Sequence, residues 1–321
     1  MTAFRLLADI GGTNIRFACS DSPGQWQHVS SYPTANHSGF LQAYDHYRQE
    51  IDLNDSPSEV LIGAAGPIQD ECVNLTNIDW SISRPEISAS LNGVKVELIN
   101  DLQAVAHALP YLAENDLRTI GEVHTGYSST QRMLALNIGT GLGASVCVPT
   151  DQGWIAIPTE AGHVTLGAVS EEENHLFQSF GPNGLSAEDI LSGSGFLNLY
   201  SHIARMESKE IPNMTAMEIF QNSDELYPAE KATRMFTRVL GRIAGDLVLA
   251  TGSWGGVYLV GGVMRGWQNQ PLLEHSMIEF RQYFEKKGQM EALMKSIFSG
   301  VVTERNIAFK GLSHFTSTTP G

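Results

Sequence analysis

Five polar residues near the middle of the sequence have side chains suited to binding a neutral ligand with several hydroxyl groups. Asn100 and Asp101 follow the apolar run "VELI", at the edge of a sheet where open α/β folds collect their ligands. Glu160 and His163 lie three residues apart in "PTEAGHV", and Glu188 lies in "LSAEDILSGSG". Carboxylates accept hydrogen bonds from hydroxyl groups that water would otherwise satisfy. Together these residues indicate a polyhydroxyl ligand.

Each of these residues also has a purely structural interpretation. Asp101 could cap the helix that follows it. Glu188, just inside a helix that Ser186 is expected to begin, could be a carboxylate that complements the helix dipole. His163 could be a hydrogen-bonded histidine of the core. The ligand hypothesis therefore depends on the residues as a set.

A glycine-rich loop near the N-terminus is suited to binding phosphate. The stretch "DIGGTNIRF" contains Asp9, Gly11, Gly12, Thr13 and Asn14 directly after an apolar run. A glycine pair admits positive φ angles and brings backbone N–H groups close to a ligand. Apolar and polar residues alternate in "IRFACS", which predicts a strand after the loop. The loop thus joins two strands, unlike Walker and dinucleotide loops, which lead into a helix.

Two further glycine loops follow later in the chain. "NIGTGLG", with Gly139 and Thr140, again lies between two apolar runs that read as strands. "VYLVGGV" ends a buried strand with Gly261 and Gly262, where the backbone could lie flat against a base or ribose. Any one of these loops could be a plain turn. The three in order favour a nucleotide site, and the repeated hairpin suggests a duplicated fold.

The length and net charge of the chain limit its domain organisation and the kinds of ligand it can bind. A chain of 321 residues, 42% of them hydrophobic, can form two domains with separate cores. Its formal net charge of −15 disfavours nucleic acid and anionic membranes as partners. With 20 Lys and Arg against 35 Asp and Glu, a nucleotide must be held mostly by backbone amides, hydroxyls and a divalent cation. The three cysteines form no C-x-x-C pair, and no apolar run suits a signal peptide or membrane span, so a cytoplasmic protein is expected.

The remaining pattern predicts an α/β protein. Strand patterns at 4–8, 15–20, 60–64 and 94–99 alternate with helical segments. Capping boxes at 83–86, 170–173 and 215–218 each predict a helix start, and the longest helix is expected over 229–251. The acidic run 171–173 is interpreted as a solvated helix N-terminus, and Pro110 is the candidate domain boundary.

The motifs in their order resemble those of the bacterial ATP-dependent glucokinases, within the hexokinase and actin-like ATPase superfamily. The similarity runs nearly end to end, through "DIGGTNIR", "LTNIDW", "LINDL", "GTGLG", "TEAGHV", "LSAEDILSGSG" and "LVGGV". It implies a two-domain α/β fold of the actin-like, duplicated ribonuclease H-like type, with an interdomain cleft. We expect a small domain over 1–110, completed by a C-terminal helix in 303–321, and a large domain over 111–302.

The resemblance also implies a role for each site residue. Asp9 would lie near a magnesium ion, the loops at 11–14 and 139–140 would hold the phosphates of ATP, and Gly261 and Gly262 would face the adenosine. The five polar residues of the opening paragraph would bind D-glucose. Asp101 would act as general base on the 6-hydroxyl, giving glucose 6-phosphate and ADP. The family also implies a cytoplasmic homodimer.

Two other functions fit parts of the pattern. An actin-like ATPase without a sugar site would leave the five polar residues without a purpose. A sugar-sensing protein that has lost catalysis would not need Asp9 and Asp101 together. The sequence therefore favours a glucokinase.

Overall fold

A computed structural model of the chain describes residues 4–75, 78–123, 130–209 and 213–316. Two residues of the "LTNIDW" motif, 76 and 77, and the end of the expected C-terminal segment, 317–321, lie outside the described residues. The chain divides into two compact units. The first comprises Met1–Leu112, Gln152–Pro158 and Glu304–Gly321, and the second comprises Ala113–Asp151 and Thr159–Thr303.

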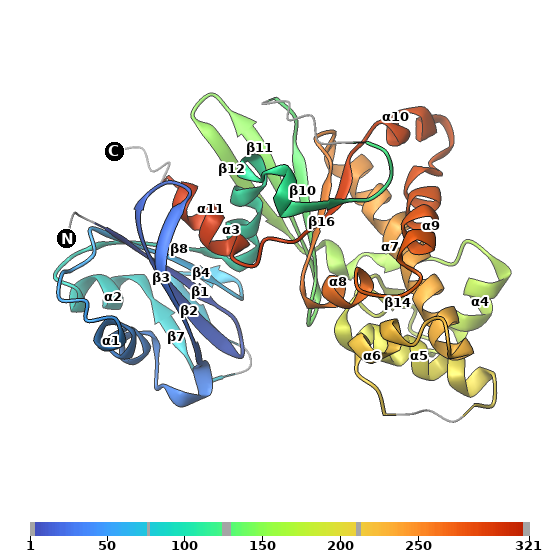
Figure 1. Cartoon of the computed structure of the whole chain (residues 1–321), viewed down its shortest axis with the longest axis horizontal. Coiled ribbons are helices and arrows are strands. Elements are labelled where there is room, and N and C mark those ends of the chain that lie inside the picture. Colours follow the sequence, from blue (N-terminus) through green and yellow to red (C-terminus); the bar gives the residue numbers. More distant parts are fainter. Residues whose placement is uncertain (1–3, 76–77, 124–129, 210–212, 317–321) are drawn as a thin grey trace. The chain divides into compact units, whose positions relative to one another are not determined.

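The first unit is built on a five-stranded sheet of order β3-β2-β1-β4-β8 (Figure 1). β2 pairs antiparallel with β1 and β3, whereas β1, β4 and β8 run parallel. The four strands expected here are confirmed, with ends shifted by two residues at most. The bounds are Arg5–Ile10 for β1, Asn14–Ser22 for β2, Gln25–Pro33 for β3, Glu59–Ala64 for β4 and Lys95–Asn100 for β8.

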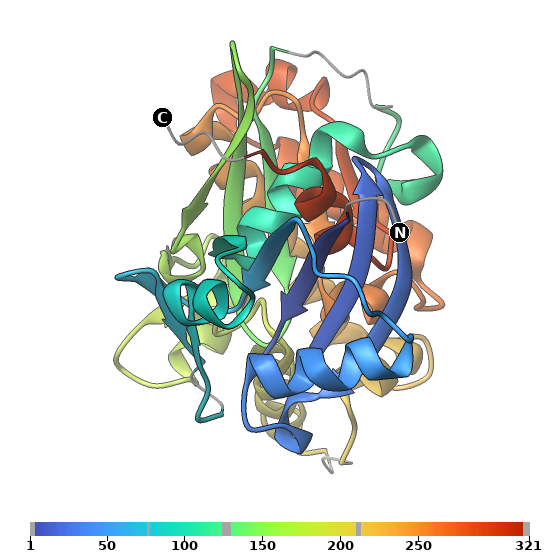
Figure 2. The ribbon, with the colours of Figure 1, turned by 90° about the vertical axis from the view of Figure 1, so that its left-hand side faces the viewer.

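Alternate residues of these strands pack against helices on opposite faces of the sheet. Leu6 belongs to a buried cluster with Tyr44 and Tyr47 of α1 (Phe40–Glu50), the helix in front of the blue strands in Figure 2. Its neighbour Leu7 belongs to a different cluster, formed with α3 and α11. Both faces of β1 are therefore covered, which explains why "RLLADI" is apolar at consecutive positions.

Helices α3 (Asp101–Ala108) and α11 (Ile307–His314) pack closely in the first unit. A Cβ placed on Gly311 would lie 1.7 Å from the carbonyl oxygen of Ala104. Only glycine allows this approach, so the C-terminal helix is held against the helix that begins with Asp101. Three short strands and one helix complete the unit: β5 (Ile68–Gln69), β6 (Cys72–Asn74), β7 (Ser81–Ser83) and α2 (Arg84–Ser90).

The second unit repeats the plan of the first. The strands of its sheet have the order β11-β10-β15-β16-β9, in which β10 pairs antiparallel with β11 and parallel with β15. Residues 153–158 of β12, the strand that follows β11 in the chain, are grouped with the first unit. The predicted duplication, an α/β fold of the ribonuclease H-like type, is thereby confirmed. The bounds are Leu117–Thr119 for β9, Met133–Ile138 for β10, Leu142–Thr150 for β11, Gly153–Thr159 for β12, Val257–Val260 for β15 and Ser299–Val302 for β16; β13 (Thr165–Leu166) and β14 (Leu185–Ser186) form a separate pair.

The long helix α7 (Tyr227–Thr251) carries the core of the second unit, and α5 and α9 pack on it (Figure 1). It begins two residues before the predicted start and ends where predicted, at a left-handed Gly252. Nowhere in the described parts of the chain is a helix long and apolar enough to cross a membrane. The other helices are α4 (Glu171–Gln178), α5 (Gly193–Met206), α6 (Ala216–Gln221), α8 (Gly262–Trp267), α9 (Leu273–Glu285) and α10 (Glu291–Lys295).

All three predicted helix starts are confirmed, but of the three capping boxes only the one at Thr215 and Glu218 has both of its reciprocal hydrogen bonds. The side chains of Ser83, Ser170 and Thr215 each accept a hydrogen bond from the backbone three residues later.

Two expectations about helix starts are wrong. Ser186 begins no helix, because Asp189 accepts from both its backbone N–H and its hydroxyl and closes a turn, and α5 starts only after Ser192. The expectation of a solvated acidic run is wrong for one of its three residues. Glu171 and Glu172 are exposed, but Glu173 is 2% exposed and pairs with Arg242 of α7.

Replacing Gly311 by alanine should separate α3 from α11. The added methyl group would overlap a backbone carbonyl, and overpacking of this kind typically costs about 1–3 kcal/mol of folding free energy. Chemical unfolding of Gly311→Ala should show a lower free energy of unfolding than the parent. Gly39→Ala is the control, since Gly39 has an extended backbone with no atom within 4 Å of its added Cβ. Equal stabilities of the two variants would contradict the close packing.

Candidate active site

The first unit brings two carboxylates together at the carboxyl ends of parallel strands. Asp9 is the fifth residue of β1, and Asp101 directly follows β8. Between them, on β4, lies Gly63, where a Cβ would be 3.7 Å from the Cα of Asp101. A Cβ at Gly63 would also lie 3.3 Å from the Cβ of Ala104, so the missing side chain lets the start of α3 lie close to β4. Burial, eased by Arg16 but reinforced by the charge of Asp101, raises the pKa of Asp9 from 3.8 to about 6.

Asp101 begins α3 but is not its cap. That position belongs to Asn100, whose Oδ1 accepts from the Leu102 N–H at 2.9 Å and whose Nδ2 donates to the Gly66 carbonyl at 3.3 Å. The same Leu102 N–H also donates to Oδ1 of Asp101 at 2.8 Å, which leaves Oδ2 for a ligand. Burial raises the pKa of Asp101, and the Leu102 hydrogen bond opposes that rise. The capping alternative thus applies to Asn100 instead.

The loop from Gly11 to Asn14 is a tight hairpin, as predicted. The Gly11 N–H donates to the Asn14 carbonyl at 2.9 Å, and the side chains of Thr13 and Asn14 are exposed. Thr34 supports the loop from a short 3₁₀ helix, donating to the carbonyls of Thr13 and Gly12 at 3.0 and 3.3 Å. Gly11 and Gly12 are not among the described glycines with positive φ, so the hairpin does not use the conformational freedom that a glycine pair admits.

Arg16 is a residue that the sequence analysis missed. It lies directly across the β1–β2 hairpin from Asp9, and its Nη1 is 3.4 Å from the Asp9 Oδ2. The same guanidinium donates to Asn306 and lies over the Phe309 ring, 4.9 Å from its centre. The register of a hairpin turning at 11–13 could have revealed this pairing. Arg16 thus offsets part of the charge at Asp9.

In the second unit, Glu188 lies beside the second glycine hairpin. Its Oε2 accepts from the Leu142 N–H at 2.7 Å, and its own N–H donates to the Gly162 carbonyl at 2.9 Å. A Cβ on Gly141 would lie 2.5 Å from the same carboxylate oxygen. The glycine at 141 therefore makes room for the carboxylate, whose Oε1 stays available to a ligand.

Glu160 and His163 lie at the two ends of a short 3₁₀ turn (Ala161–His163). Between them Gly162 is buried, and a Cβ there would lie 1.9 Å from the Leu142 carbonyl oxygen. Both polar side chains are exposed, so His163 is not a core histidine. The turn and the glycine hairpin therefore hold Glu160, His163 and Glu188 in one part of the second unit.

The third glycine site requires glycine for its conformation. Gly261 has a φ of 107°, and a Cβ there would lie 2.2 Å from the Ile138 carbonyl oxygen. Gly262 begins α8, is exposed and has no atom within 4 Å of an added Cβ. The backbone after β15 is thus accessible, as the nucleotide hypothesis requires.

The predicted residues form two sets, one on each unit. Asp9, the first loop, Asn100 and Asp101 belong to the first unit, and the others belong to the second. Among the described residues no group of three or more His, Cys, Asp or Glu is arranged to hold a metal by itself.

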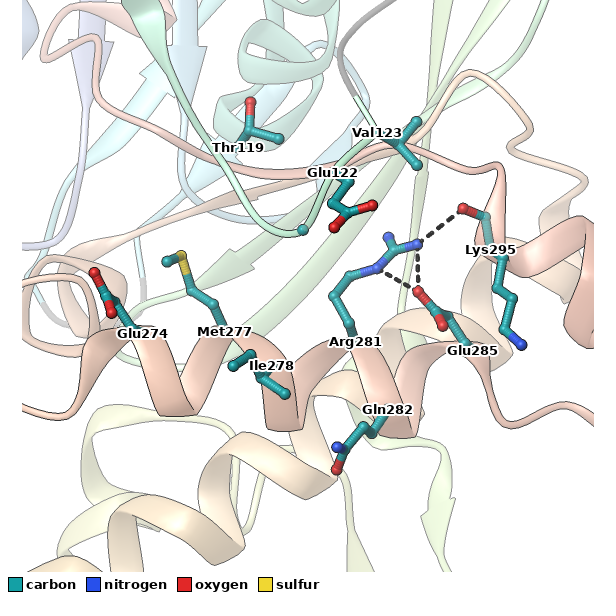
Figure 3. A pocket seen from close by; sticks show the side chains of 11 residues that line it. Thr119, Glu122, Val123, Glu274, Met277, Ile278, Arg281, Gln282, Glu285 and Lys295 are labelled. Atoms are coloured by element: carbon teal, nitrogen blue, oxygen red, sulfur yellow. Dashed lines mark hydrogen bonds and ion pairs between the residues drawn. The ribbon is translucent and has the colours of Figure 1, made fainter.

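A cavity of about 920 Å³ in the second unit contains none of the predicted residues (Figure 3). Arg281 on one wall is tied to Glu285 at 2.7 Å. The cavity therefore does not belong to the predicted site.

Comparison with known proteins identifies the family. The family model of glucokinases matches residues 6–319. The chain belongs to the glucokinase family. The glucokinase of Nitrobacter hamburgensis is 31% identical, with 98% of this chain and 97% of that protein covered. That of Erwinia tasmaniensis is 32% identical, with 91% and 90% covered. The chain is therefore a sugar kinase, an enzyme of the transferase class.

A solved structure supports the same assignment at the level of the fold. The crystal structure of a glucokinase from an Antarctic psychrotroph is 29% identical to this chain, with a TM-score of 0.86 over 98% of both chains. The actin-like ATPase fold implied by the resemblance is thus confirmed.

Asp9→Asn should change how stability depends on pH. In the folded protein Asp9 keeps its proton to a pH near 6, whereas the unfolded chain releases it near its ordinary pKa of 3.8. Folding stability therefore falls as the pH rises between these values. At pH 7 to 8 the variant should be more stable than the parent, by roughly 1–3 kcal/mol, and at pH 4 nearly equal to it. Chemical unfolding across this range measures the difference; a constant difference would show that the pKa of Asp9 is not raised.

Proposed function

We propose that this enzyme transfers the γ-phosphoryl group of ATP to the 6-hydroxyl of D-glucose, giving glucose 6-phosphate and ADP. The observation that carries the proposal is the Asp101 carboxylate, buried beside Asp9 and bound through only one oxygen to the protein. The glucokinase names of the relatives support glucose as the sugar. ATP as the phosphoryl donor is what the resemblance to the ATP-dependent glucokinases implies.

Asp101 would act as the general base. Phosphoryl transfer passes through a loose transition state, so the protein mainly aligns the attacking oxygen and excludes water. The free oxygen of Asp101 would accept the proton of the 6-hydroxyl while the new oxygen–phosphorus bond forms. Its raised pKa makes it a better proton acceptor than an exposed carboxylate.

The glycine loops would hold the nucleotide. Gly11, Gly12, Thr13 and Asn14 would bind phosphate through backbone N–H groups and the exposed side chains, with Gly139 and Thr140 doing the same in the second unit. Gly261 and Gly262 would face the adenosine.

Asp9 would hold Mg²⁺ together with the phosphates of ATP. Burial and a second acid nearby make the ionised form of Asp9 unfavourable, and a bound cation would stabilise that form. In kinases Mg²⁺ is usually bound by one or two carboxylates together with phosphate oxygens. Bound there, the ion would neutralise charge on the phosphates.

Glucose would be bound by Asn100, Asp101, Glu160, His163 and Glu188, each unit contributing its own part. Glu188 is held by Leu142 through one oxygen and can accept a sugar hydroxyl with the other. The family resemblance further leads us to propose a cytoplasmic homodimer, which size-exclusion chromatography with light scattering would test.

Asp101→Asn should abolish most of the activity. An amide cannot take the proton, so kcat for glucose should fall at least ~10²-fold, the typical worth of a general base. An ADP-release assay with glucose and ATP measures the loss. Glucose binding should persist, because the asparagine oxygen can still accept from Leu102.

Asp116→Asn provides a matched control. Asp116 also accepts a backbone hydrogen bond, from Ala113 at 2.8 Å, but lies outside the predicted site. Its kcat should equal that of the parent. If Asp101→Asn also stays within a few-fold of the parent, Asp101 is not the base.

The enzyme should prefer glucose strongly over N-acetylglucosamine. The acetamido group removes a hydroxyl at C2 and adds bulk where Glu160 would accept, leaving a polar group of the site unpaired. Sites built for a hydroxyl can reject such an analogue by roughly 10⁴ in kcat/KM. The same assay over a panel of hexoses checks this ratio. Equal or higher kcat/KM for N-acetylglucosamine would overturn glucose as the substrate while leaving the kinase chemistry intact.

A further inference from the structure

The segment that follows His163 is weakly packed. Residues 167–170, between β13 and α4, are all exposed, and Val169 retains 62% of its surface. The loop borders a cavity of about 560 Å³, whose other lining residues belong to α7, to α9 and to the two residues after α9. Side-chain packing therefore does little to fix this loop, although it lies only four residues after His163.

Two charged side chains hold the loop by its backbone. Nη1 of Arg242, on α7, donates to the Gly167 carbonyl at 2.7 Å. Oε2 of Glu173, on α4, accepts from the Val169 N–H at 2.9 Å. The two side chains pair with each other at 3.1 Å and are 11% and 3% exposed. The loop is thus tied to α7, the longest helix of the second unit, through one buried ion pair.

Backbone hydrogen bonds connect this loop to the residues proposed to bind the sugar. β13 pairs with β14, which leads directly to Glu188. The N–H groups of Ala187 and Glu188 donate to the carbonyls of Val164 and Gly162, both at 2.9 Å. Hydrogen bonds therefore connect the stretches that carry Glu160, His163 and Glu188. The loop at 167–170 ends this connected segment, and the Arg242–Glu173 pair holds that loop where side-chain packing does not.

We propose that Arg242 and Glu173 are positioning residues for the sugar site, an inference that rests on the proposed function. A buried ion pair adds little net stability compared with apolar residues of similar volume. Each member of this pair also makes one hydrogen bond to the loop backbone, so the main effect of the pair is on where the residues proposed to bind the sugar lie. Neither side chain touches substrate.

Arg242→Met should weaken sugar binding without impairing the chemical step. We expect KM and Kd for glucose to rise at least ~10-fold, while KM for ATP and kcat at saturating glucose stay within about threefold of the parent. Glu173→Gln should act in the same direction. Arg242→Lys, which keeps the charge but cannot bridge Gly167 and Glu173 with a planar fork, should give an intermediate KM.

Arg238→Met is the matched control. Arg238 lies one turn earlier on α7 and pairs with Glu172 of α4 at 3.2 Å and Glu279 of α9 at 2.7 Å, but makes no bond to the loop. It should lower the melting temperature as Arg242→Met does and leave KM for glucose within twofold of the parent. Equal effects of the two variants on KM for glucose would show that the Arg242 pair is only structural.

Hydrogen exchange separates this inference from the proposed function. The Val169 amide should exchange at least ~10-fold faster in Arg242→Met than in the parent or in Arg238→Met, whichever sugar is the substrate. Unchanged exchange would overturn the positioning role. A parent enzyme that fails to phosphorylate glucose, with faster Val169 exchange in the variant, would instead overturn glucose as substrate and keep the anchor.

Discussion

The candidate site of the first unit is shaped by the free-energy cost of burying two like charges next to each other. Asp9 and Asp101 lie at the ends of strands separated by a single strand, on which Gly63 lets the start of α3 lie close to the sheet. Water would solvate both carboxylates, whereas here burial and mutual repulsion raise the pKa of Asp9 to about 6. The surrounding groups reduce this penalty only in part. Arg16 pairs with Asp9, and the Leu102 N–H donates to Asp101. Such a site favours a cation and a proton-donating hydroxyl, which are the two partners that the proposed reaction supplies.

Close backbone contacts place these groups, and glycine makes the contacts possible. Gly311 lets α11 approach α3, while Gly162 and Gly141 let the polar turn and Glu188 approach the second hairpin. At each of these positions a methyl group would overlap a carbonyl or carboxylate oxygen. The glycines of this chain therefore contribute through volume at least as much as through backbone freedom, which only Gly261 among the site glycines requires.

In the second unit, buried acidic side chains are paired with basic ones, unlike the two neighbouring carboxylates of the first unit. Acidic and basic side chains of α4, α7 and α9 form buried or half-buried ion pairs, including Arg242 with Glu173 and Arg238 with Glu279. Although the chain carries a net charge of −15, three arginines that lie four residues apart on α7 pair with glutamates of α4 or α9, namely Arg234, Arg238 and Arg242. The Arg242–Glu173 pair also holds the loop after His163, so the packing of the helices and the placement of the turn proposed to bind the sugar are linked.

The sequence by itself determined β1, β2, β4 and β8, the two glycine hairpins, the long helix and the three helix starts, because each follows from local periodicity or from residues three apart. It also identified the family, since the motifs occur in a fixed order. The helix expected at Ser186 and the solvated state expected for Glu173 were wrong, because Asp189 and Arg242, which decide them, act through contacts that local propensity does not report. Only the tertiary structure showed that Asn100 caps α3, that Arg16 faces Asp9 and that Arg242 holds the loop at Gly167. These contacts join residues from different elements, and their energies depend on burial, which exists only once the chain has folded.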